Sequence, residues 1–174
     1  MAFGIDDALT AATAGLKLTE TLVDIVKRYR GVKPDHDFEE LLGEVRNTAL
    51  SRINDADLAL TQFERTLVER GVDLRMRMSD VISHTTLWRP FEQYRLSQIH
   101  KRFNEFSDSV YCAIGDIAAL ARCRGQTEDL GLAVVQSTRA KHVFQEKLLS
   151  AGSLKEQIEL LRSQLLQQKA ELSR

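Results

Sequence analysis

Apolar residues at helical spacing run through most of the chain. The clearest series steps by three or four residues from Phe38 to Leu67, and it predicts a helix of about 34 residues that ends at Gly71. A second series predicts a helix from Pro90 to Gly125. Because this spacing gathers the apolar side chains on one face, each helix must bury that face against other helices.

Shorter patterns surround these two helices. The first helix is expected from about Asp6 to Arg30, with Asp6 or Asp7 as its N-cap and Gly31 just past its end. Residues 72–90 alternate like a strand but have no partner strand, so they predict a short helix or an irregular connector.

The last third of the chain predicts two helical pieces separated by "GSLKE". The first spans about Glu128 to Ser150, and the second begins with a capping box formed by Ser153 and Glu156. Asp37 and Glu40 have the same spacing at the start of the 34-residue helix. The second piece either continues the preceding helix after a kink or forms a short coiled-coil-like segment.

The expected fold is therefore all-α. We expect an up-and-down bundle of four to five long helices over residues 1–152, and a C-terminal amphipathic helix at 153–174 that continues or extends the bundle. The 174 residues include 24 basic and 25 acidic ones, which argues against a nucleic-acid partner because such binders normally carry a basic face. The sequence has neither a signal-peptide pattern nor a run of about 18 apolar residues, so we expect a cytoplasmic protein.

The motifs of common enzymes and metal sites are missing from the sequence. It has no glycine-rich phosphate loop, no nucleophile-turn motif, and no histidine three or four residues from another histidine or a cysteine. We therefore expect no catalytic residues, no cofactor and no metal. Cys112 is expected to be a small buried filler. Cys123 stands between Arg122 and Arg124, whose charges favour a thiolate, but we expect an ordinary cysteine at a helix end.

Residues 8–16, "ALTAATAGL", are free of charge although 28% of the chain is charged. Three interpretations are open: a close-packed helix, a docking segment for a protein partner, or a helix that enters a membrane, where small residues allow helices to associate. In the membrane interpretation, leucines insert and nearby cations hold anionic headgroups. The inserting residues would be Leu9, Leu16, Leu18 and Leu22, and the headgroup-binding residues Lys17, Lys27, Arg28 and Arg30.

The stretches "MAFG", "LVDIVKRYRG" and "FEELLGEVRNTALSRINDAD" make residues 1–70 resemble the N-terminal helical domains of fungal NLR-type immune receptors, the HeLo and HeLo-like group. The resemblance implies a bundle that oligomerises and permeabilises membranes through its N-terminal helix, here Met1 to Leu22. The sequence shows neither the nucleotide-binding domain of such receptors nor an amyloid-type signalling motif.

Two functions follow from these observations. The first is a non-enzymatic signalling or cell-death effector that oligomerises and is recruited to anionic lipids at the inner face of the plasma membrane. The alternative is a soluble scaffold or adaptor that binds protein partners and oligomerises through its C-terminal segment. Its coiled-coil positions would be Leu154, Ile158, Leu161 and Leu165.

Overall fold

A computed structural model describes residues 9–10, 12–13, 16, 18–84 and 90–174 of the chain, and this part forms six helices and no strand. The prediction of an all-α bundle is confirmed. The helices are α2 (Thr19–Tyr29), α3 (His36–Glu69), α4 (Met78–His84), α5 (Pro90–Arg122), α6 (Thr127–Ser150) and α7 (Leu154–Leu172).

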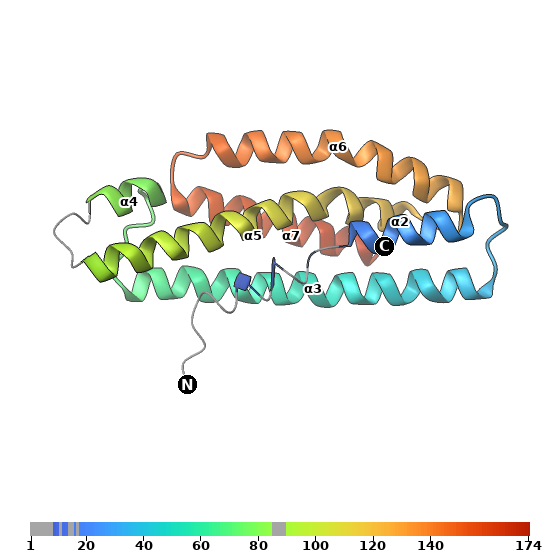
Figure 1. The fold of residues 1–174 in the computed structure, drawn as a ribbon, viewed down its shortest axis with the longest axis horizontal. Coiled ribbons are helices and arrows are strands. Elements are labelled where there is room, and N and C mark those ends of the chain that lie inside the picture. Colours follow the sequence, from blue (N-terminus) through green and yellow to red (C-terminus); the bar gives the residue numbers. More distant parts are fainter. Residues whose placement is uncertain (1–8, 11, 14–15, 17, 85–89) are drawn as a thin grey trace.

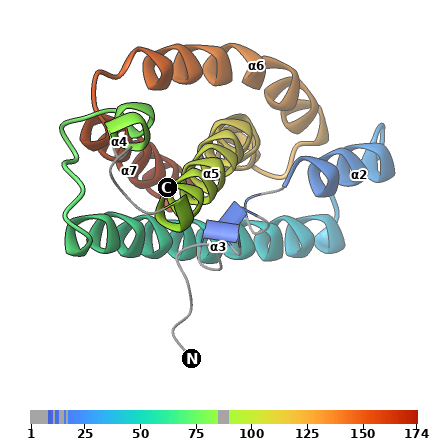
Figure 2. The ribbon, with the colours of Figure 1, turned by 60° about the vertical axis from the view of Figure 1, so that its left-hand side comes forward.

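The long helices run alternately up and down the bundle (Figure 1). Helices α3 and α5 extend along its length, and α7 packs against both. Helix α6 packs on α5 on the side away from α3, and no other described helix lies on the outer side of α6 (Figure 2). The short α2 packs against α5 and α6 near one end of the bundle, and α4 lies at the other end.

The ends of α3 follow local sequence signals. Asp35 is its N-cap, and its carboxylate accepts a hydrogen bond of 2.9 Å from the backbone N–H of Phe38. The sequence predicted Asp37 as the cap, whereas the observed cap lies two residues earlier. At the other end Gly71 has a φ of 74°, and the N–H of Val72 reaches back to the carbonyl of Leu67, a geometry that favours glycine.

Helices α3 and α5 are joined by a side chain as well as by their apolar faces. The guanidinium of Arg46 donates hydrogen bonds to the carbonyls of Leu120 and Cys123, which are left without helical partners at the end of α5. Midway along the pair, the rings of Phe63 and Phe103 stack with centroids 4.8 Å apart. The two longest helices thus form one continuous core.

The start of α7 is fixed by the connector that the alternating residues 72–78 form. The backbone N–H groups of Leu154 and Lys155 donate to the carbonyls of Met76 and Leu74. Ser153 caps α7 as predicted, by accepting from the N–H of Glu156. Helix α7 turns back antiparallel to α6 (Figure 1), so the prediction that it continues α6 after a kink is wrong.

The expected single first helix is interrupted. Residues 9–10 and 12–13 are helical, Leu16 lies in a turn, and α2 begins only at Thr19; Asp6 and Asp7 lie outside the described residues. Leu16 and Leu18 are both buried. In one continuous helix, residues two apart point about 200° away from each other, so the interruption lets both leucines face the core.

Candidate functional site

The four leucines predicted to insert into a membrane all lie in the core. Their side chains are at most 2% exposed, and they belong to the same apolar cluster as the central residues of α3 and α5. They are Leu9, Leu16, Leu18 and Leu22. In this conformation none of them can contact lipid. Membrane contact by these leucines therefore requires the N-terminal segment to leave the bundle. Here "N-terminal segment" means the described residues up to Tyr29.

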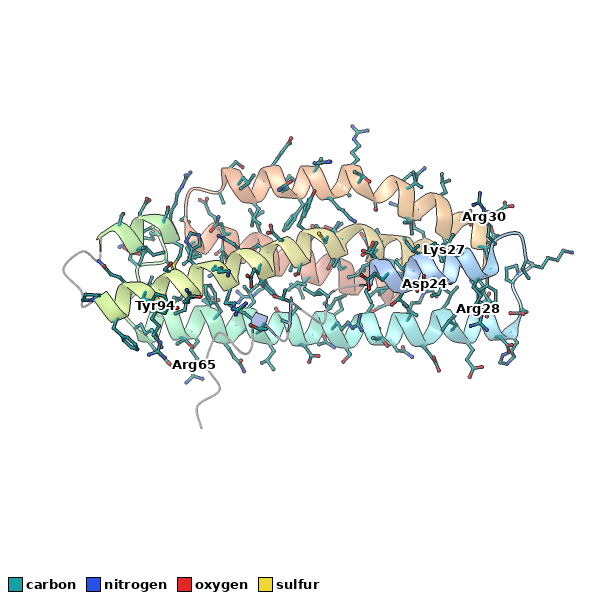
Figure 3. The ribbon with its side chains drawn as sticks, in the orientation of Figure 1. Asp24, Lys27, Arg28, Arg30, Arg65 and Tyr94 are labelled. Carbon is teal, nitrogen blue, oxygen red and sulfur yellow. The ribbon has the colours of Figure 1, made fainter. Side chains whose placement is uncertain are left out.

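The predicted headgroup-binding residues have the opposite placement. Lys27, Arg28 and Arg30 are exposed, and they lie where α2 ends (Figure 3). The guanidinium of Arg28 lies 5.5 Å from the centre of the Tyr29 ring, which holds it by a cation–π contact. Lys17 lies outside the described residues. The first turn of α3 brings acidic residues to the same end, so this surface is mixed in charge.

A buried carboxylate joins the N-terminal segment to the bundle. The hydroxyl of Thr19 donates a hydrogen bond of 2.5 Å to Oδ2 of Asp116 on α5. The ammonium of Lys141 on α6 lies 3.9 Å from Oδ1, which accepts no hydrogen bond in the described part of the chain. Asp116 therefore links three helices, and we call Thr19, Asp116 and Lys141 the polar joint.

Asp116 is the one charged side chain that is buried among the described residues, with 1% of its surface exposed. Burial raises its pKa, because removing a carboxylate from water penalises the charged form. The hydrogen bond from Thr19 and the charge of Lys141 act in the opposite direction but do not cancel this effect. The polar joint thus holds a carboxylate that water would solvate better.

Close packing of α5 on α6 explains why this carboxylate is shielded. A Cβ atom built on Gly115 would collide with the side chain of Ser137 and would crowd the Lys141 side chain. Only glycine lets the two helices approach this closely beside Asp116. The sequence carried one unused signal of this site, an aspartate directly after a glycine inside the apolar stretch "AIGDIAAL".

The predicted coiled-coil positions lie inside the protomer. Leu154, Ile158, Leu161 and Leu165 are buried, and α7 packs on α3 and α5. Arg162 strengthens this packing, since its guanidinium lies 2.7 Å from a carboxylate oxygen of Glu64 on α3. A coiled coil between copies would therefore require α7 to leave the bundle.

The expectation that Cys112 is a buried filler is wrong, because Cys112 is exposed. Cys123 directly follows the last residue of α5, as expected for a cysteine at a helix end, and it is buried. Burial raises the pKa of the Cys123 thiol despite the nearby Arg46, so its neutral form is favoured. In the described part of the chain, no three His, Cys, Asp or Glu residues are grouped as a metal site would require. No described helix is long and apolar enough to cross a bilayer.

Comparison with known proteins returned no match to this chain, either among protein-family models, among curated proteins or among solved structures.

Proposed function

We propose that this protein is a non-enzymatic signalling or cell-death effector that self-associates and binds anionic membranes through its N-terminal segment. The resemblance of residues 1–70 to HeLo-like domains suggests this class of activity. In this proposal the protein resides in the cytoplasm with the segment packed, and is recruited to the inner face of the plasma membrane when the segment is released.

The observation that carries the proposal is the polar joint. If the contact between the segment and the bundle were purely apolar, its separation would carry only a free-energy cost. Here separation lets water reach Asp116, and the recovered hydration offsets part of the cost of exposing leucines. A buried charged link of this kind gives a specific attachment without a strong one.

The apolar side of the segment decides where it can go. Burying one leucine stabilises a fold by about 1.5–3 kcal/mol, so exposing the four leucines to water costs roughly 6–12 kcal/mol as an upper estimate. That is close to the whole stability of a typical domain. Release into water is therefore rare, and the released leucines need an apolar environment such as the interfacial region of a bilayer.

The charges at the end of α2 favour an anionic bilayer. Each Lys or Arg near an anionic surface contributes about 1 kcal/mol of attraction. Lys27, Arg28 and Arg30 follow directly after the apolar side chains of α2, as in helices that lie in the membrane interface with one face buried. We propose interfacial binding by the released segment.

The alternative, a scaffold that oligomerises through α7, has less support. It would have to expose four leucine and isoleucine side chains that α3 and α5 cover. It would also break the ion pair between Arg162 and Glu64. Helix α7 also buries a polar side chain, Gln168, whose amide atoms have no hydrogen-bond partner in the described part of the chain, but this side chain carries no charge.

A disulfide between α2 and α6 tests the release directly. A Cβ atom built on Gly131 lies 3.9 Å from Cγ1 of Val26, so side chains at these two positions meet where α2 packs on α6, as an engineered disulfide requires. We expect the Val26→Cys/Gly131→Cys protein, made with Cys112→Ser, to float with anionic liposomes and release an enclosed dye when reduced. The oxidised protein should do neither, because α2 stays on the bundle.

The reduced protein is its own control, and Val26→Cys alone under oxidising conditions controls for the oxidant. The reduced protein should bind less to liposomes of neutral lipid than to anionic ones. Equal dye release by the locked and the reduced protein would contradict release of α2, and no binding by either would contradict membrane association itself.

A further inference from the structure

Helix α6 has large apolar side chains on two opposite sides. Its inner side packs on α5, with Leu130, Phe144 and Leu148 among its buried residues. Its outer side exposes Leu132, Val135, Val143 and Leu149, which are 57%, 73%, 45% and 71% exposed. Large apolar side chains gathered on an exposed helix face can mark a contact surface, and no described helix covers the outside of α6 (Figure 2).

Two opposite charges interrupt the apolar residues on this outer side. Arg139 and Glu146 are both exposed, and neither forms an ion pair within the described part of the chain. They are seven residues apart, about 10 Å along the helix, which is too far for a direct ion pair between them. Both side chains are therefore available to a partner from outside the protomer.

These residues form a single stripe. At about 100° per residue, positions 132, 135, 139, 143 and 146 fall within about 40° of one line along α6. Between Val135 and Glu146 the surface along this stripe forms a shallow, open depression. Leu149 lies about 80° to one side of this line, at the edge of the stripe. We call Leu132, Val135, Arg139, Val143, Glu146 and Leu149 the outer stripe.

We propose that the outer stripe pairs with the outer stripe of a second copy, with the two α6 helices antiparallel about a twofold axis. When Arg139 faces Glu146 of the second copy, the axis passes between His142 and Val143. Symmetry then forms the same ion pair a second time. A parallel arrangement would instead place Arg139 against Arg139, which like-charge repulsion disfavours.

The apolar residues agree with this register. Val143 comes next to the axis and meets Val143 of the second copy, and Val135 comes level with Leu149 of the second copy on the same side of the interface. The stripe therefore complements itself in both charge and hydrophobicity. This self-complementarity favours a second copy over an unrelated partner as the occupant.

This inference names the surface for the self-association in the proposed function, and it is independent of the membrane step. The test is made in solution without lipid, so its failure leaves the release of α2 untouched. A single pair of helices forms a small interface. Its buried area is close to about 1,000 Å², the lower limit for specific association. We therefore expect a dimer with a dissociation constant on the order of micromolar.

Charge reversal is the first experiment, with the dissociation constant measured by sedimentation velocity over a wide range of protein concentration. Arg139→Glu and Glu146→Arg alone should each weaken the dimer about tenfold or more, because each creates two like-charge contacts. The double variant Arg139→Glu/Glu146→Arg should restore it, since the exchanged charges again face each other. Lys155→Glu and Glu159→Lys on α7 make matched changes of net charge and should leave the dimer unchanged.

Cross-linking is the second experiment, in a Cys112→Ser background because Cys112 is exposed. Val143→Cys should form a disulfide-linked dimer under mild oxidation, because the two copies of residue 143 meet beside the axis. Leu132→Cys is the matched control, since its two copies would lie about 30 Å apart along the helices.

A wild-type protein that is monomeric at all concentrations would overturn the proposal, and the outer stripe would then await a different protein. A dimer that both single charge reversals leave intact would also overturn it. Equal cross-linking through residues 132 and 143 would overturn the proposed register.

Discussion

At the scale of single residues, Asp116 has the clearest consequence for the N-terminal segment. Its pKa is raised in the folded protein, so the folded state binds a proton more tightly than the unfolded chain does. The associated stability is present below the unfolded value of about 3.8 and is lost as the pH rises through the folded value. At neutral pH the charged carboxylate therefore weakens the polar joint.

Neutralising this residue should stabilise the protein. We expect Asp116→Asn to raise the free energy of unfolding by about 1 kcal/mol at pH 7, with an advantage over wild type that shrinks toward pH 4. Thr19→Val should act in the opposite direction, by about 1–3 kcal/mol, because it removes the hydrogen bond to the buried carboxylate. Urea unfolding from pH 4 to 7 measures both. Stability differences that do not change with pH would show that Asp116 titrates as it does in the unfolded chain.

At the scale of elements, the contact between α5 and α6 depends on one glycine. We expect Gly115→Ala to lower the free energy of unfolding by about 1–3 kcal/mol, because the added methyl group collides with Ser137 and forces the helices apart. Gly43→Ala is the matched control: a Cβ atom there meets nothing within 4 Å, so it should stabilise α3 by about 0.5–1 kcal/mol. Urea midpoints compare the two, and equal effects would mean that α6 can shift without cost.

The helices themselves could largely be predicted from the sequence, because their signals are local. The apolar series from Phe38 to Leu67 and the glycine after it define α3 within a few residues. The polar joint could not be predicted, since Thr19 and Asp116 are 97 residues apart and meet only through the fold. The break in the expected first helix at Leu16 and Leu18 could not be predicted for a related reason. Burial of both side chains in the core outweighs the continuity of the helix.

At the scale of the whole molecule, the bundle divides into four long helices and a short N-terminal segment that packs on them. Helices α3, α5, α6 and α7 share most of the helix packing, whereas the short α2 packs near the ends of α5 and α6 and touches α3 through the rings of Tyr29 and Phe38. Regions with fewer buried contacts open separately and at lower free energy than the core does. The segment should therefore leave while the other helices keep their structure.

Native-state hydrogen exchange tests this division. We expect the amides of Leu22 to Tyr29 to exchange through an opening several kcal/mol below that of the α5 amides from Phe103 to Leu120. Asp116→Asn should slow exchange in α2 selectively, because a neutral joint holds the segment more tightly, whereas Gly43→Ala should leave α2 unchanged. If α2 and α5 instead exchange with the same opening free energy, the protein unfolds as one unit. Membrane binding would then have to use a surface that is already exposed, such as the end of α2 that carries Lys27, Arg28 and Arg30.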